Sequence, residues 1–178
     1  LLSTQDDALA ETARRLRNHG SSARYVHERL GYNSRLDALQ AAVLRVKLPH
    51  VEAWNRARRE AAARYDLLLA GLPGLVRPLL APGHVFHQYT VRILDETSDG
   101  STGGVLRDRV REHLARRGVA STVYYPVPLH RSPVYGERYG PLPAAERAAR
   151  EVLSLPLWPS VAPEQQERVA AALREALD

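Results

Sequence analysis

A polar turn at residues 31–35, with the sequence GYNSR, has side chains suited to binding an anion. The amide of Asn33 and the guanidinium of Arg35 both donate hydrogen bonds to phosphate or carboxylate oxygens. Ser34 and Asp37 have the spacing of a capping box, which predicts a helix that begins at Ser34 with free backbone amides. The turn is therefore either an ordinary helix cap or an anion site, and from the residues alone we favour the cap.

Residues 124–130, with the sequence YYPVPLH, combine stiffening prolines with hydroxyl and imidazole side chains. Tyr124, Tyr125 and His130 can stack on a polyhydroxylated ligand and hydrogen-bond to it at several points. The alternative is a surface loop held in place by aromatic packing. The residues alone favour neither interpretation over the other.

His87 belongs to a third polar group, residues 85–89, with the sequence VFHQY. Alternation along a predicted strand puts His87 on the same face as Val85 and Tyr89, which favours a hydrogen-bonded core histidine. The seven histidines include no HxxxH or HxH pair and the chain has no cysteine, so no metal site is predicted. GxSxG, P-loop and GxGxxG motifs are also missing, and Lys47 is the only lysine available for amine chemistry.

The composition is that of a soluble globular protein, with 178 residues, 44% hydrophobic, 25% charged and a net charge of +5. No apolar run reaches the roughly 18 residues that a membrane helix needs, and no signal-peptide pattern is present, so no membrane partner is expected. The lack of cysteine favours a cytoplasmic location. Basic residues alternate with acidic ones at helical spacing, as in Glu60/Arg64 and Glu146/Arg150, which predicts solvated ion pairs rather than a nucleic-acid surface.

Helical and strand periodicities place these groups on a mixed set of elements. Pro49 is expected to kink or divide the longest helix. The region from about Pro73 onward is expected to form a small sheet with helices on one face, an α+β domain, whereas the residues before it have helices with almost no sheet. Helices are predicted at residues 5–20, 34–71, 105–117, 144–152 and 163–177; strands at 84–94, 119–124 and 153–157, with the end of another at 1–4; and loops at 21–32, 95–104 and 125–143.

Five segments resemble, in this order and spacing, the DegT/DnrJ/StrS family of sugar aminotransferases: RLRNHG, GYNSRLDALQAAVLRVKL, FHQYTVR, YYPVPLHRSPVY and AERAAREVLSLPLWPSV. The resemblance covers essentially the whole chain. It implies the α/β type I aminotransferase fold, pyridoxal 5'-phosphate (PLP) as cofactor and a homodimer. It also implies transfer of an amino group, usually from glutamate, to a keto sugar carried on a nucleotide, as in polysaccharide or antibiotic sugar biosynthesis.

The resemblance also implies roles for the three polar groups. Asn33 stands where the family has an asparagine that reaches the PLP phosphate of the neighbouring subunit, and Arg35 follows it at the dimer interface. The resemblance thus favours a phosphate site at the turn, which is compatible with a helix cap because both use free amides and a short polar side chain. The substrate contacts that the resemblance implies are His27, Tyr32, His87, Tyr124, Tyr125 and His130.

The family's Schiff-base lysine lies upstream of the strand that ends at residues 1–4, so no catalytic residue is expected within this chain. Lys47 stands in the family's KL position within an amphipathic helix, where a structural role is expected. We therefore expect the C-terminal portion of the enzyme, inactive alone, with residues 1–72 ending the large domain and including the interdomain helix, and residues 73–178 forming the small domain. The apolar stripe along residues 36–68 would pack against the upstream half.

Three functions stay open. In order of preference, they are part of a sugar aminotransferase, a non-catalytic dimerising or regulatory remnant of that family, and nucleic-acid binding through the arginine-rich surface. The family also includes dehydratases that differ at upstream positions, so these residues do not set the reaction type, the sugar or the carbon that is aminated. Asn33 separates the first two functions, since its replacement matters only in a protein that binds the cofactor.

Overall fold

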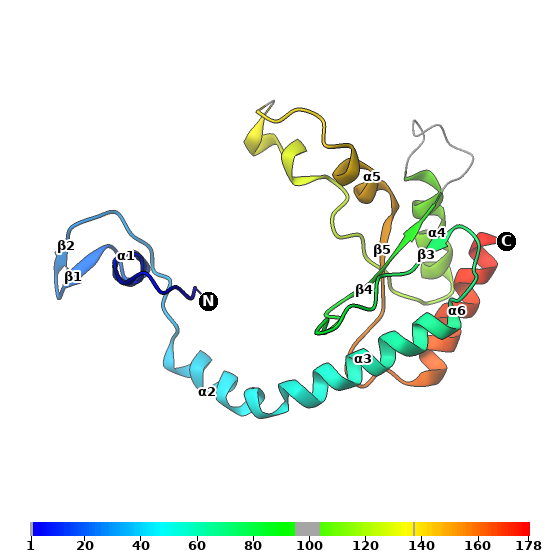
Figure 1. Cartoon of the computed structure of the whole chain (residues 1–178), viewed down its shortest axis with the longest axis horizontal. Coiled ribbons are helices and arrows are strands. Elements are labelled where there is room, and N and C mark those ends of the chain that lie inside the picture. The colour runs from blue at the N-terminus through cyan, green and yellow to red at the C-terminus, as the bar shows by residue number, and fades with distance from the viewer. Residues whose placement is uncertain (1, 95–103, 137) are drawn as a thin grey trace. The chain divides into compact units, whose positions relative to one another are not determined.

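The structure, a computed structural model, describes residues 2–94, 104–136 and 138–178 (Figure 1). It consists of two compact units, Leu1–His50 and Val51–Asp178. Most of the predicted loop 95–104 lies outside the described residues. Within the described ranges, none of the helices has the length and apolar composition needed to cross a bilayer.

Helix α1, Asp7–Arg17, confirms the helix predicted near the start of the chain. Its N-cap is Asp6, whose carboxylate accepts hydrogen bonds from the amides of Ala8 and Leu9 at 2.9 and 3.0 Å. Residues 2–4 do not form the predicted strand, since a strand needs a hydrogen-bonded neighbour and none of the described segments pairs with them.

A short antiparallel hairpin follows α1, where the residues predict a loop. Its strands are β1, Ser21–Ala23, and β2, Val26–His27. Both strands are largely exposed and too short to show the apolar alternation by which strands are recognised.

The N-cap of helix α2, Ala38–Lys47, is Asp37 and not Ser34, so the predicted cap is wrong. The amide of Ser34 is bound to the carbonyl of Arg17 at 2.8 Å, which ties residue 34 to the end of α1. Asp37 instead has an extended backbone (φ −73°, ψ 152°), and its amide donates to Gln40 Oε1 at 3.3 Å.

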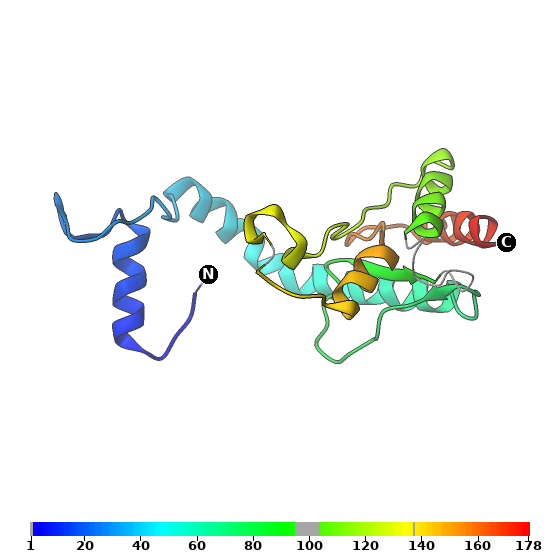
Figure 2. The same cartoon turned by 90° about the horizontal axis from the view of Figure 1, so that it is seen from above.

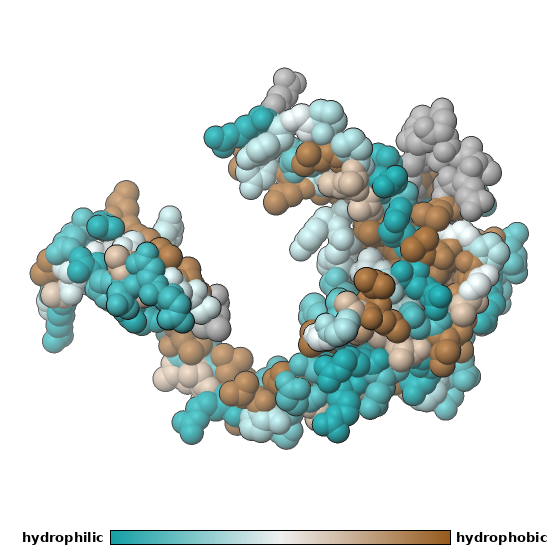
Figure 3. All heavy atoms as spheres, in the orientation of Figure 1, coloured by the Kyte–Doolittle hydropathy of each residue, from teal (hydrophilic) through white to brown (hydrophobic). Residues whose placement is uncertain are grey.

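Pro49 divides the long helix, as predicted, because the 3₁₀ turn η1, Leu48–His50, separates α2 from α3, Val51–Leu68. The burial of the predicted apolar stripe changes at this turn. Its α2 part is exposed and forms the apolar surface over that helix in Figure 3, whereas Tyr65 on α3 is fully buried within the second unit. The exposed apolar side chains on and beside α2 are Leu36, Leu39, Val43, Leu44, Val46 and Leu48.

The second unit contains an antiparallel three-stranded sheet together with helices, which confirms its predicted α+β composition. The strand order is β3-β4-β5. Figures 1 and 2 show α6 beside both α3 and α4, with which it is in contact. The elements are β3, Leu75–Val76; β4, Tyr89–Ile93; α4, Val105–Arg116; α5, Pro143–Glu151; β5, Val152–Leu155; and α6, Pro163–Leu177.

The core of this unit is formed by the sheet with helices α3, α4 and α6. In β4 the alternate residues Tyr89, Val91 and Ile93 are buried while Thr90 and Arg92 are partly exposed, which confirms a strand with one partly polar face. Fully buried side chains from the other elements complete the core, namely Tyr65, Leu69, Val110, Leu114, Leu153, Gln166 and Leu173.

Two predicted strands are longer than those observed. Residues 84–88 do not belong to β4, because Phe86 has a positive φ of 49°, which an extended strand does not contain. Residues 119–124 form only a single bridge, between Thr122 and Ser154. The prolines that follow this segment have no N–H groups with which to extend the ladder.

Helix α3 packs with the residues that follow it in the chain. Gln166 of α6 is fully buried and donates to the carbonyl of Ala61 at 2.8 Å, while Arg64 Nη1 donates to Gln166 Oε1 at 2.7 Å. The second compact unit therefore begins at Val51. No contact among the described residues tests the domain boundary predicted at residues 72–73, which stays a prediction.

Candidate functional site

The turn at residues 31–35 is fixed to the C-terminal end of α1 by backbone hydrogen bonds. The amide of Tyr32 donates to Leu16 O at 2.7 Å, and the amide of His19 donates to Tyr32 O at 2.9 Å. Carbonyls in the last turn of a helix have no partner within the helix, and the amides of Tyr32 and Ser34 satisfy two of them, those of Leu16 and Arg17. The backbone of the turn is therefore held, while its side chains remain exposed.

Two glycines allow this close approach. A Cβ at Gly31 would lie 2.1 Å from Gly20 N and 2.6 Å from the carbonyl carbon of His19. A Cβ at Gly20, where φ is +70°, would lie 1.8 Å from Arg29 O. These distances are far below contact with backbone atoms, so only glycine fits at either position. The sequence pattern identifies Gly20 as a helix terminator but not as a packing site.

Asn33 and Arg35 lie on this turn with exposed side chains, but not at a helix N-terminus. Helix α2 begins only at Ala38, and Asn33 instead forms an isolated antiparallel bridge with Asn18. The expectation that helix amides help to bind an anion at the turn is therefore wrong. The turn offers one side-chain amide and one guanidinium, a pair whose donors suit a phosphate.

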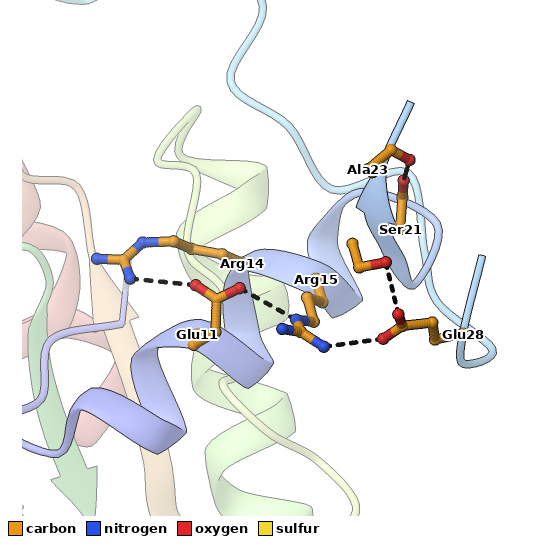
Figure 4. A network of polar contacts seen from close by, with 7 residues as sticks. Glu11, Arg14, Arg15, Ser21, Ala23 and Glu28 are labelled. Atoms are coloured by element: carbon orange, nitrogen blue, oxygen red, sulfur yellow. Dashed lines mark hydrogen bonds and ion pairs between the residues drawn. The ribbon is translucent and has the colours of Figure 1, made fainter. Parts of the chain in front are cut away.

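Charged side chains tie the hairpin to α1 (Figure 4). Arg15 Nη1 donates to Glu28 Oε2 at 2.9 Å, while Arg15 Nε donates to Glu11 Oε1 at 3.0 Å. Ser22 completes the network by donating to Glu28 Oε1 at 2.8 Å. The hydrogen bond from Arg15 also lowers the pKa of Glu11, which favours the ionised carboxylate.

His27 and Tyr32, two predicted substrate contacts, are exposed on this hairpin and on the turn that follows it. His27 Nδ1 lies 3.1 Å from His19 O, a contact that orients the imidazole ring. The first unit thus carries four of the predicted site residues, namely His27, Tyr32, Asn33 and Arg35.

A pocket of about 400 Å³ lies in the second unit and brings together two more predicted residues, His87 and Tyr124. His87 is exposed, so the predicted core position is wrong, and Phe86 is buried in its place. Trp158 also lines the pocket, and the sequence does not predict it as a site residue. The chain has two tryptophans, and Trp158 is the one outside the predicted helices, which could have indicated it. The lining includes His87, Gln88, Thr122, Tyr124, Ser154 and Trp158.

Hydroxyl groups gather at this pocket. Ser154 Oγ is 2.8 Å from Thr90 Oγ1, and among the described residues the buried Ser121 Oγ has no hydrogen-bond partner. Trp158 and Tyr124 add aromatic rings that are 40% and 45% exposed. Hydroxyl groups beside aromatic rings suit a polyhydroxylated ligand.

The YYPVPLH loop has an exposed part and a buried part. Tyr125 is 74% exposed, and its ring meets that of Tyr124 edge-on, with centroids 5.9 Å apart. His130 is buried, and its Nε2 lies 3.0 Å from Glu146 Oε1. Two of the predicted contacts therefore remain exposed on the loop, while His130 anchors it.

We expect this anchor to survive mild acid. Hydrogen bonds from His130 and then Arg131 lower the pKa of Glu146 from its ordinary value of 4.5 to about 2. Because the pKa is lower in the folded state, the carboxylate stabilises the fold fully above about pH 4.5 and loses this contribution as the pH falls towards 2. Urea unfolding should show the stability advantage of the wild type over Glu146→Gln shrinking only in that acid range. A difference that stays constant at every pH would contradict the prediction.

Known proteins match this chain along nearly its whole length. A profile of the DegT/DnrJ/EryC1/StrS aminotransferase family matches residues 1–174. The chain is 48% identical over 177 residues to the dTDP-3-amino-3,4,6-trideoxy-alpha-D-glucose transaminase of Streptomyces venezuelae, covering 97% of this chain and 44% of that protein. It is 45% identical over 182 residues to the pleiotropic regulatory protein of Geobacillus stearothermophilus, covering 98% of this chain and 46% of that protein.

The fold agrees with these matches. The crystal structure of S. venezuelae DesV is similar with a TM-score of 0.81 and 47% identity, over 97% of this chain and 45% of DesV. The chain thus spans less than half the length of the relatives it matches, and it has the C-terminal portion of their fold, as the resemblance predicts. Since the profile and the fold both match over nearly all of its residues, the chain belongs to the DegT/DnrJ/EryC1/StrS aminotransferase family.

Proposed function

We propose that the enzyme carrying this chain transfers an amino group from an amino acid, preferably glutamate, to a nucleotide-linked keto sugar. The aminotransferases of this family use PLP, and several relatives are named as nucleotide-sugar aminotransferases. The observation that carries the proposal is the turn at residues 31–35, whose exposed amide and guanidinium stand on a backbone fixed to α1. Such a pair recognises a phosphate, which is the group that PLP presents.

Asn33 and Arg35 hold the cofactor phosphate of the partner subunit in the proposed homodimer. The amide donates hydrogen bonds to phosphate oxygens, and the guanidinium adds charge as well as hydrogen bonds. Because backbone bonds already hold the turn, little conformational entropy is lost when the phosphate binds. When bound, PLP would supply an aldehyde group that accepts the amino group and a ring that accepts electrons from the substrate.

The sugar occupies the pocket of the second unit in this proposal. His87 and Tyr124 hydrogen-bond its hydroxyl groups, while the Trp158 ring offers a face for the sugar to pack on. Tyr125 reaches the sugar from the exposed part of the loop. We also propose His27, Tyr32 and His130 as substrate-site residues on the strength of the family resemblance, with His130 acting by holding the loop.

The lysine that forms the imine is proposed to lie outside residues 1–178. Lys47 stands in the last turn of α2, at the family position where a structural role is expected. The chain matches 44% of the transaminase of Streptomyces venezuelae, so the larger part of such an enzyme lies outside the match and can supply the lysine. The chain alone is therefore proposed to be inactive.

Isotope transfer tests the proposed reaction. The enzyme carrying this chain, loaded with PLP, is incubated with a dTDP- or UDP-linked keto sugar and ¹⁵N-glutamate. The proposal requires a ¹⁵N-labelled amino sugar and an equal amount of 2-oxoglutarate, both measured by mass spectrometry. A sugar that loses water without gaining nitrogen would indicate a dehydratase, and unchanged sugar would reject an enzymatic role.

Replacing Tyr124 by phenylalanine is expected to raise KM for the keto sugar about tenfold, because one hydrogen bond to the sugar contributes about 1.4 kcal/mol. The ring, which is edge-on to Tyr125, stays in place. Tyr139→Phe is the matched control, since Tyr139 is also partly exposed but does not line the pocket. Steady-state kinetics with varied keto sugar measure the effect. Equal KM values for both variants would show that the Tyr124 hydroxyl does not contact the sugar.

A second candidate is a non-catalytic regulatory protein, which the name of the relative from Geobacillus stearothermophilus favours. It predicts no isotope transfer and no response of any property to Asn33→Ala. An enzyme predicts that Asn33→Ala lowers the amount of PLP that stays bound after gel filtration. The absorbance of bound PLP therefore separates the two functions.

A further inference from the structure

Glu146 lies in the first turn of α5, where one carboxylate oxygen joins three positions of the chain. Its Oε1 is 3.0 Å from His130 Nε2, and it accepts hydrogen bonds from Arg131 Nε and Nη2 at 2.9 and 2.8 Å. The amide of Leu142 also donates to it, at 3.4 Å. The sequence pattern instead predicts a solvated pair with Arg150, so this junction is a product of the tertiary fold.

The junction is shielded from water. The side chain of His130 is 6% exposed and that of Glu146 is 23% exposed, while Arg131 is about half exposed. A buried imidazole that loses its partner bears a desolvation cost without compensation. The arrangement is therefore held to one geometry, and removing the carboxylate would release His130 from it.

The loop that carries the two exposed tyrosines is coupled to this junction. The 3₁₀ turn η2, Leu129–Arg131, holds His130, and the amide of Arg131 donates to Pro128 O at 2.9 Å. Pro126 and Pro128 restrict the backbone between Tyr125 and η2, because the proline ring fixes φ. These fixed φ angles leave fewer backbone rotations to absorb a displacement at His130 before it reaches the tyrosines.

The other end of α5 is fixed as well. Arg107 of α4 is buried and donates from Nη1 to Ala149 O and Val152 O, both at 3.1 Å. Val152 begins β5, which continues directly to Ser154 in the wall of the pocket. Glu146 thus connects the loop to an element that is rigidly joined to the pocket.

We propose that Glu146 is a positioning residue for the nucleotide sugar, which it never touches itself. Through His130 and Arg131 it holds the loop so that Tyr124 and Tyr125 face the sugar. This inference rests on the proposed function. It predicts that Glu146 affects KM for the keto sugar but neither KM for the amino donor nor kcat.

The test uses Glu146→Ala and Glu146→Gln in the PLP-loaded enzyme that carries this chain. Glu164→Gln is the matched control, because Glu164 is an exposed acid in the first turn of α6, a helix that also begins with proline. Hydrogen exchange of the amides of Arg131, Ser132 and Tyr135 reports the loop without any need for activity. Steady-state kinetics with varied keto sugar, and then with varied glutamate, report the function.

For Glu146→Ala we expect the hydrogen-exchange rates of the loop amides to rise about tenfold, and KM for the keto sugar to rise by about the same factor. In the same variant, kcat and KM for glutamate should stay within about twofold of wild type. Glu146→Gln keeps an acceptor oxygen without the charge, so its values should lie between those of wild type and the alanine variant. It also serves as the main variant if Glu146→Ala does not fold. The control should match wild type throughout.

Four outcomes overturn the proposal. Unchanged exchange would show that the carboxylate does not hold the loop, and faster exchange with an unchanged KM for the sugar would show a purely structural role. An equal loss of kcat, whether the keto sugar or glutamate is varied, would mean that Glu146 acts in the chemical step or on overall stability. A wild-type enzyme that does not aminate the keto sugar would reject the proposed function together with this inference, whereas an active wild type with an unaffected variant rejects this inference alone.

Discussion

Replacing Gly31 by alanine is expected to lower the affinity of the enzyme for PLP about a hundredfold. The new Cβ would lie 2.1 Å from Gly20 N, and its other near neighbours, the His19 carbonyl carbon and Leu16 O, are also backbone atoms. No flexible side chain can give way, so the turn must leave the end of α1. Overpacking of this kind costs about 3 kcal/mol, which equals about a hundredfold in affinity if Asn33 binds only from the docked turn.

Equilibrium dialysis of PLP against the variant and the wild type measures this loss. Gly140→Ala is the control, because Gly140 has no positive φ and a Cβ there meets no atom within 4 Å. The hydrogen exchange of the Tyr32 and Ser34 amides, which are bound to α1 in the wild type, should increase in Gly31→Ala alone. Faster exchange without any loss of PLP would show that the turn docks as described but does not bind the phosphate.

Replacing Arg107 by alanine should lower the free energy of unfolding by about 3 kcal/mol, since hydrogen bonds from a charged donor contribute about 1.5–3 kcal/mol each. Arg107 is 6% exposed, and its Nη1 donates hydrogen bonds to two carbonyls at the junction of α5 and β5. These carbonyls would lose a buried partner, and a cavity would remain where the side chain packs.

Thermal unfolding should show this as a decrease in Tm of about 6–12 °C, given about 2–4 °C per kcal/mol for a cooperative unit of about 150–250 residues. Arg109→Ala is the matched control, because Arg109 stands on the same helix, α4, with an exposed side chain. Its Tm should stay within about 2 °C of wild type, as for most surface substitutions. Equal Tm values for the two variants would mean that the buried guanidinium contributes nothing net to stability.

Local signals were sufficient for most helices of this protein. Helix α6 begins at Pro163 as predicted, and Gly118, with a φ of +71°, follows the end of α4. Pro49 divides the long helix for the same local reason, since proline lacks the N–H that a continuous helix needs. The order and spacing of the five family segments along the chain were enough to indicate the family, and the profile match confirms it.

Strands were predicted less well, because their hydrogen bonds lie between distant segments. The hairpin at residues 21–27 is exposed, and it is held by Arg15 and Glu28 rather than by an apolar face. The side chains of residues 84–88 follow the pattern of a strand, yet the positive φ at Phe86 excludes these residues from β4. His87 is therefore exposed at a pocket. Neither outcome can be read from the spacing of residues along one segment.

The sequence by itself determined the family, the main helices and the residue types that the site needs, since those depend on local spacing and on resemblance. Only the tertiary structure decided which hydrogen-bond partners the polar groups have. Glu146 bonds His130, 16 residues away, and not Arg150 on its own helix, and Ser34 bonds the end of α1 and does not cap α2. The reason is physical: a carboxylate or amide takes the partner that the folded chain brings within hydrogen-bond distance. For Glu146 that partner is the buried His130, where a hydrogen bond is worth more than on an exposed helix face.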